Sequence, residues 1–208
     1  MKLYLHPLSP NCVKVLVTAA LSEVTLETEV ADFDRQTHRS AAYLALNPNG
    51  LFPLLVDGDF ALWESNAIAQ YVAAQKPANP LWPQGERARA DIARWQFWEL
   101  AHWFPAVRPF QWENLFKPLK GQGEPDPEAL DKAQAALAPL AAMLDAHLAE
   151  RAWLAGPDMT LADLSVASNL VYRRPARMPL EPYAHLNRWM ERIEALPAWR
   201  AAQPPDFG

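Results

Sequence analysis

The segment "NPNGLFPLLVDGDFALWESNAIAQYVA", residues 47–73, carries the clearest signals of the fold in this sequence. It contains two apolar runs, Pro53–Val56 and Phe60–Trp63, joined by Asp57-Gly58. Asp-Gly between apolar runs is a strong signal for a β-hairpin. Beyond the second run, apolar residues recur at helical spacing over residues 65–75. The segment therefore predicts a hairpin followed directly by a helix.

The sequence before this segment predicts a strand, a helix and a second strand. Leu3–Leu5 is a short apolar run, and residues 10–22 place their apolar residues on one helical face. Val24–Val30 then alternates apolar and polar residues, which is typical of a half-buried strand. The order strand, helix, strand, irregular connection, hairpin, helix predicts an α/β domain with a mixed four-stranded sheet.

The sequence after it is predicted to be entirely helical. Residues 77–85 form a Pro-rich linker, so we expect one domain over residues 1–76 and an all-helical domain over residues 86–208. Prolines 105 and 109 are expected to kink or interrupt an aromatic-rich helix that begins near residue 86. Asp126-Pro127 predicts the start of a long helix, in which Pro139 predicts a kink. Thr160 and Asp163 resemble a capping box.

Composition excludes several classes of protein. The 208 residues carry a formal net charge of −5, which argues against a nucleic-acid-binding surface. A single cysteine rules out an internal disulfide. No apolar run approaches the ~18 residues of a membrane span, and the first residues do not resemble a secretion signal. The five histidines show no metal-ligand spacing, so no metal site is expected. A cytoplasmic protein without membrane or nucleic-acid partners is the resulting expectation.

Two segments together resemble the glutathione S-transferase superfamily, in its cytosolic, bacterial form. Residues 47–73 look like the family's glutathione-binding core, and "LAGPDMTLADLSVA", residues 154–167, looks like the folding motif of its helical domain. The resemblance covers nearly the whole chain. It implies a thioredoxin-like first domain, an all-α second domain, and glutathione as a substrate.

The resemblance also implies which residues grip the peptide. Phe52 precedes Pro53, and in the family this bond is cis, so that the backbone of residue 52 pairs with the cysteinyl unit. Glu64 is expected to take the γ-glutamyl ammonium, and Ser65, a suitable helix N-cap, the carboxylate. Simple capping of the helix is the alternative.

Two basic residues in the irregular connection are candidates for the other end of glutathione. His38 and Arg39 stand where phi-like members carry a His-Lys pair that contacts the glycyl carboxylate. A guanidinium can bind a carboxylate through two hydrogen bonds. The alternative is a solvated loop pair. Leu51 departs from the Gln or Lys that many relatives have after the glycine, so that contact must come from elsewhere.

The turn "LSPNC", residues 8–12, offers three candidates for activating the thiol. Ser9 precedes the helix, where a hydroxyl can donate to a thiolate, and it matches the catalytic serine of phi-like and theta-like members. Asn11 matches relatives with Thr-Pro-Asn that act mainly as glutathione-dependent disulfide reductases. Cys12 is interpreted as a small buried apolar residue rather than a nucleophile. We therefore expect Ser9 first and Asn11 second.

The second substrate is expected to be a small hydrophobic electrophile. In the family it binds between the two domains, against the first turn and the first long helix of the second domain. The candidates for that pocket are Leu8, Trp103, Phe104, Val107 and Trp112.

The leading prediction is a homodimeric glutathione transferase that acts in detoxification. One alternative is a glutathione-dependent disulfide reductase or peroxidase that uses the Ser-Pro-Asn turn. The other is a non-catalytic member that binds a partner protein.

Overall fold

The protein is described here from a computed structural model, which covers residues 1–31 and 36–204. Its contacts divide the chain into two units. The first, called the sheet unit, runs from Met1 to Gln84 and resumes at Leu196, and the second, called the helical unit, is Gly85–Ala195. The segment from Leu196 thus groups with the sheet, whereas the sequence placed it with the helices, because Trp199 is buried and α10 (Pro197–Ala201) packs on α1 (Pro10–Leu21).

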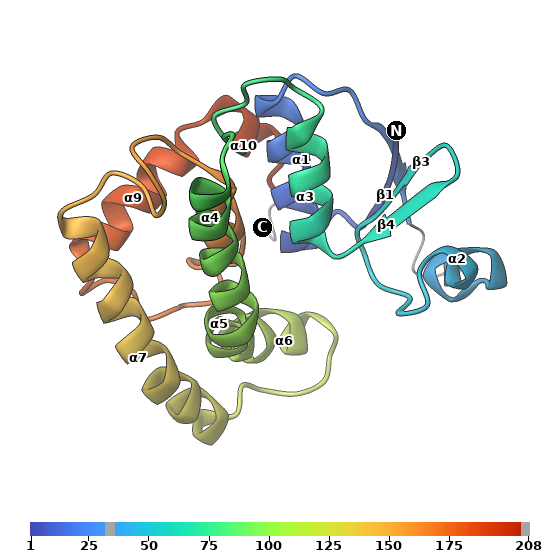
Figure 1. The fold of residues 1–208 in the computed structure, drawn as a ribbon. Helices are drawn as coiled ribbons and strands as arrows, with labels where there is room; N and C mark the ends of the chain where they lie inside the picture. Colours follow the sequence, from blue (N-terminus) through green and yellow to red (C-terminus); the bar gives the residue numbers. More distant parts are fainter. Residues whose placement is uncertain (32–35, 205–208) are drawn as a thin grey trace. The chain divides into compact units, whose positions relative to one another are not determined.

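The sheet unit contains the predicted mixed four-stranded sheet, which confirms the fold class. Its other elements are β1 (Lys2–Leu5), β2 (Glu27–Val30), η1 (Thr37–Arg39), α2 (Ala41–Leu46), β3 (Leu54–Asp57), β4 (Phe60–Trp63) and α3 (Ser65–Ala74). The strand order is β2-β1-β3-β4. β1 runs parallel to β2 and antiparallel to β3, which is antiparallel to β4. In Figure 1, α1 and α3 lie side by side on one side of the strands and α2 on the other.

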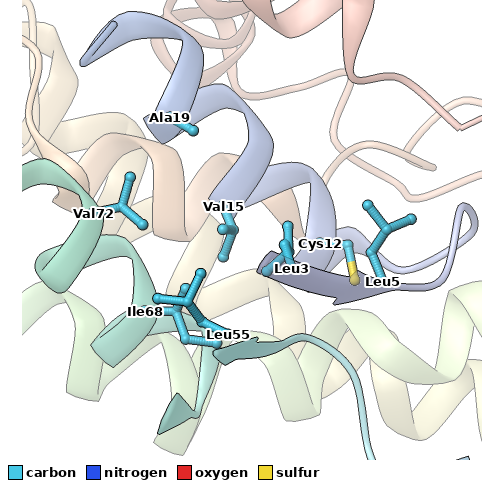
Figure 2. Close-up of a cluster of buried hydrophobic side chains, with 8 residues drawn as sticks. All are labelled: Leu3, Leu5, Cys12, Val15, Ala19, Leu55, Ile68 and Val72. Atoms are coloured by element: carbon cyan, nitrogen blue, oxygen red, sulfur yellow. The ribbon is translucent and has the colours of Figure 1, made fainter. Parts of the chain in front are cut away.

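The core of the sheet unit forms where α1 and α3 meet the central strands. Figure 2 shows its buried side chains, which come from β1, α1, β3 and α3: Leu3, Leu5, Cys12, Val15, Ala19, Leu55, Ile68 and Val72. This packing is the reason why the helical periodicity of α1 and α3 was readable in the sequence.

Two details of the sheet differ from the sequence prediction. The second strand begins only at Glu27, and Val30 is 59% exposed, because β2 is an edge strand and the apolar Val24 and Leu26 pack on the core before the strand starts. The hairpin turn consists of Gly58 and Asp59, one residue later than predicted, since Asp57 still pairs with Phe60.

The helical unit is built around one wholly buried helix. Its elements are α4 (Glu86–Trp98), η2 (Glu99–Trp103), α5 (Phe104–Gln111), η3 (Trp112–Phe116), α6 (Lys117–Leu119), α7 (Pro127–Ala149), α8 (Leu161–Ser168) and α9 (Ala184–Glu194). All eight residues of α8 are buried. No helix in residues 1–31 and 36–204 is long and apolar enough to cross a membrane.

The prolines of the helical unit do not break its helices. Pro105 and Pro109 lie within α5, and the chain widens into π-helical turns before and after it, at η2 and η3. A wider turn accommodates a residue that lacks an N–H and crowds the preceding turn. α7 likewise runs through Pro139 as one α-helix. The helix is therefore not interrupted at Pro105 or Pro109, and of the two expected outcomes the kink stays a prediction.

Both predicted caps of the helical unit are confirmed. The Asp126 carboxylate accepts hydrogen bonds from the N–H groups of Glu128 and Ala129. Thr160 and Asp163 form a reciprocal capping box at the start of α8.

Candidate functional site

The turn from β1 into α1 presents Ser9 at the start of the helix. The N–H of Ser9 donates to the carbonyl of His6 (3.0 Å), and its own carbonyl accepts from the N–H of Cys12 (2.9 Å). Ser9 is the N-cap residue, yet within the described chain its side chain makes no capping hydrogen bond. Its half-buried hydroxyl thus lies beside the positive end of α1 without being used to cap it.

Cys12 is unsuited to act as the nucleophile. Its side chain is 1% exposed and lies beside Leu5 in the core, as Figure 2 shows. Burial raises the pKa of the Cys12 thiol to about 11, although hydrogen bonds from the His6 N–H and the Ser9 side chain act in the opposite direction. A thiol with this pKa is almost fully protonated at neutral pH, and the thiolate is the reactive form.

Asn11 and Ser65 are joined although 54 residues separate them in the chain. The Ser65 hydroxyl donates to Asn11 Oδ1 at 3.2 Å. This bond links the first turn of α1 to the first turn of α3. It also assigns the Asn11 carbonyl oxygen to Ser65, which leaves the amide NH₂ as the donor that Asn11 can offer to a ligand.

Glu64, and not Ser65, is the N-cap residue of α3. Ser65 is the first helical residue and is buried, whereas the Glu64 side chain is exposed. The Glu64 backbone has φ 72°, a left-handed conformation that non-glycine residues seldom adopt and that is enriched at binding sites. The predicted N-cap role of Ser65 is therefore wrong, while the exposed carboxylate of Glu64 stands directly before the free N–H groups of the helix.

Two side chains fix the backbone next to Phe52 by hydrogen bonds. The bond from Phe52 to Pro53 is cis, as the resemblance implied. The preceding carbonyl, that of Leu51, accepts hydrogen bonds from the Tyr43 hydroxyl (2.7 Å) and from Asn47 Nδ2 (2.8 Å). Because a trans peptide points its C=O and N–H in opposite directions, fixing this oxygen also fixes the direction of the Phe52 N–H.

His38 and Arg39 lie next to the same loop. The His38 ring is 5.8 Å from the ring of Phe52, centroid to centroid. Gly50 has φ +60°, and a Cβ placed there would come within 3.0 Å of both Arg39 Nη1 and the His38 carbonyl oxygen. The absence of a side chain at Gly50 thus allows the basic pair to approach the loop that leads to Phe52.

The predicted pocket residues differ in how much surface they offer. Leu8 is half-buried in the turn before α1. In the helical unit, Trp103 and Val107 are fully buried, and the Trp103 indole donates to the carbonyl of Val166 (3.2 Å). Phe104 is partly exposed and Trp112 is 37% exposed. Of the four helical candidates, only these last two present aromatic surface within their own unit.

The sequence did not predict the residues that hold the site in place by hydrogen bonds. Tyr43 and Asn47 hold the Leu51 carbonyl, and Lys14 donates hydrogen bonds to both Ser65 and Asn66. One signal was present: Lys14 stands between Val13 and Val15 in a helix that is apolar on nearly every face. Within residues 1–31 and 36–204, no three His, Cys, Asp or Glu side chains are grouped so that they could hold a metal ion.

Comparisons with known proteins find matches in both units of the chain. Residues 1–74 match the family model for the glutathione S-transferase N-terminal domain, and residues 97–197 match that for the C-terminal domain. Glutathione S-transferase 3 of Zea mays is 38% identical over 96% of this chain and 91% of its own length. Glutathione S-transferase GstB of Escherichia coli K12 is 33% identical over 92% of each chain.

A solved structure extends the likeness to a ligand-bound protein. The theta class glutathione S-transferase from Xanthomonas axonopodis pv. citri, with glutathione bound, superposes with a TM-score of 0.88. Its sequence is 30% identical, and the match covers 100% of this chain and 98% of that one.

Proposed function

This chain belongs to the glutathione S-transferase family and is a glutathione transferase, and we propose that Ser9 activates the thiol while the loop at Phe52 and the start of α3 hold the peptide. The observation that carries the proposal is the hydrogen bond from Ser65 to Asn11, which ties the peptide-binding end of the site to the catalytic turn.

The peptide would be bound at three points. The backbone of Phe52 pairs with the cysteinyl unit as a short added strand, since the Leu51 carbonyl is already fixed from the other side. Glu64 takes the ammonium of the γ-glutamyl group, and the N–H groups at the start of α3 take its carboxylate. His38 and Arg39 take the glycyl carboxylate.

The chemical step is an attack by sulfur on an electrophilic carbon. The Ser9 hydroxyl donates to the glutathione sulfur, and with the positive end of α1 it favours the thiolate over the thiol. The thiolate supplies the electron pair of the new C–S bond, and the leaving group departs with its own pair. In an addition, the electron pair moves into the electrophile, which then takes a proton from water. Holding both reactants together supplies most of the remaining rate.

The test compares Ser9→Ala with Asn11→Ala in the conjugation of glutathione to a chloronitrobenzene. Losing the hydroxyl donor should raise the apparent pKa in the pH profile of kcat/KM by about one unit, which is ~1.4 kcal/mol of thiolate stabilisation. Asn11→Ala should mainly raise KM, because it releases Ser65. An unchanged pH profile in Ser9→Ala contradicts the role of Ser9. The reductase alternative would be favoured if the wild type reduces a hydroxyalkyl disulfide faster than it conjugates the chloronitrobenzene, and if Asn11→Ala loses this reduction while Ser9→Ala keeps it.

For the electrophile, we propose Phe104 and Trp112 as contacts, with a role in detoxification of small hydrophobic compounds. Trp112→Ala should raise KM for the electrophile and leave KM for glutathione unchanged. If KM for the electrophile and KM for glutathione change equally, the variant has lost structure in general.

We also propose a cytoplasmic homodimer, as expected from the family. Phe97 is 71% exposed and Leu100 is 41% exposed, one helical turn apart at the end of α4 and the start of η2. Light scattering coupled to size exclusion should give twice the 23.4 kDa mass of the chain. Phe97→Glu should shift it to the monomer, and a wild-type monomer at micromolar concentration would contradict the proposal.

A further inference from the structure

Lys14 is a fully buried cation in the sheet unit. It lies in α1 between the buried residues Val13 and Val15, and it is 0% exposed. Burying a lysine side chain is costly unless its donors are satisfied. A residue that only filled space at this position of the helix would be apolar, so the position calls for an electrostatic explanation.

The Lys14 ammonium points at the start of α3. Its Nζ donates to Ser65 Oγ at 3.2 Å and to Asn66 Oδ1 at 2.7 Å. Ser65 and Asn66 are the first two residues of α3, a helix of ten residues. Ser65 in turn donates to Asn11. Lys14 is therefore hydrogen-bonded directly to the first turn of α3, the end of the helix at which the backbone N–H groups have no partner within the helix.

The positive charge and the helix terminus act in the same direction. The N–H groups and the dipole already favour an anion at the start of α3. A buried charge is screened less than an exposed one, so Lys14 adds to the potential there more than a surface lysine would. Its hydrogen bonds to Ser65 and Asn66 also orient these two side chains.

We propose that Lys14 is a positioning residue that makes the start of α3 selective for a peptide with a free α-carboxylate at its γ-glutamyl end. This inference rests on the proposed function, because it assigns that carboxylate to this end of the site. Lys14 would not touch the peptide, since its side chain has no exposed surface. It would act through the side chains it orients and through its charge.

The test separates charge recognition from structural support by using two peptides. Titration calorimetry measures Kd for glutathione and for 4-aminobutyryl-cysteinyl-glycine, which differs only by lacking the α-carboxylate. Wild type should prefer glutathione. Lys14→Met, of similar length without the charge, should reduce that preference by about tenfold, ~1.4 kcal/mol. If Lys14 has a purely structural role, Lys14→Met should weaken the binding of both peptides equally and leave the ratio of their Kd values unchanged.

Two further variants complete the design. Lys76→Met is the matched control, because Lys76 pairs with Glu23 just beyond the opposite end of α3, about 15 Å along the helix. It removes the same charge and should keep the ratio. Asn66→Asp keeps the lysine but places a carboxylate beside its Nζ. It should lower the ratio as Lys14→Met does, and it decides the matter if Lys14→Met does not fold.

The outcomes distinguish this inference from the proposed function. A wild-type protein that binds neither peptide overturns both. A wild-type protein that prefers glutathione, with the same ratio in folded Lys14→Met or Asn66→Asp, overturns the role of Lys14 alone. The role of Lys14 is supported if Lys14→Met and Asn66→Asp lower the preference for glutathione over the peptide without the α-carboxylate, while Lys76→Met leaves that preference unchanged.

Discussion

Replacing Asp163 should be among the most destabilising single changes in the helical unit. The side chain is 0% exposed, and Oδ1 accepts from the Leu154 N–H and the Trp189 indole, both at 2.9 Å. Oδ2 accepts from the Thr160 N–H at 2.9 Å. The same oxygen also accepts from the Thr160 hydroxyl at 3.3 Å. Asp163→Ala leaves four buried donors unpaired at about 1–3 kcal/mol each, or about 4–12 kcal/mol in all. A typical domain is stable by only about 5–15 kcal/mol, so we expect this variant to unfold or nearly so.

Asp163→Asn is the more informative variant, because it keeps the shape. Its amide oxygen can still serve the Leu154 N–H and the Trp189 indole, but its NH₂ group then faces the Thr160 N–H. We expect a loss of about 2–4 kcal/mol, for one unpaired donor and a repulsive contact. Urea unfolding, followed by tryptophan fluorescence and far-UV circular dichroism, measures it. Asp158→Asn, in the exposed loop just before, is the control and should stay within about 0.5 kcal/mol of wild type.

The pH dependence tests the same carboxylate by its sign. Burial raises the pKa of Asp163 from 3.8 to about 6, against the hydrogen bonds from Thr160, Leu154 and Trp189. Because the folded pKa lies above the unfolded one, stability from this group is present below about pH 4 and is lost as pH rises through about 6, by up to ~3 kcal/mol. The advantage of wild type over Asp163→Asn should therefore shrink across this range. An advantage that grows with pH, or an Asp163→Asn variant as stable as wild type, would refute the reasoning.

Three further predictions concern the sheet unit. Gly50→Ala should destabilise the protein by about 1–2 kcal/mol and weaken glutathione binding, since its Cβ would press on the His38 carbonyl at positive φ; thermal melts and calorimetry measure both. Tyr43→Phe removes one of two donors to the Leu51 carbonyl, so KM for glutathione should rise about threefold to tenfold while kcat stays within twofold; a change in kcat alone would contradict this. Cys12→Ala should keep full activity, and native protein should resist iodoacetamide at pH 7, because the thiol is buried with a pKa of about 11; rapid labelling would disprove it.

The sequence alone determined the elements whose signal is local. The hairpin and helix of residues 53–74 and the capped helix starts at Asp126 and Thr160 depend on neighbouring residues, and the structure has them. The mixed sheet was predicted from the order of the elements, and the structure has it too. The family followed from the same short motifs. Patterns failed where tertiary contacts compete with local preference. The helix after residue 98 continues past Pro105, with π-helical turns before and after α5, because its buried face, which includes Trp103, keeps it packed.

Only the tertiary structure decided how the site is supported. Nothing in the spacing of Asn11, Lys14 and Ser65 reveals that a buried ammonium and a hydroxyl chain join α1 to α3. Tyr43 likewise reaches the Leu51 carbonyl only because the chain folds back between them. A hydrogen bond is directional and short-ranged, so it depends on where two helices or a helix and a loop meet in space. The sequence names the residues that could take part, and the packing of α1, α3 and the loop at Phe52 selects which of them do.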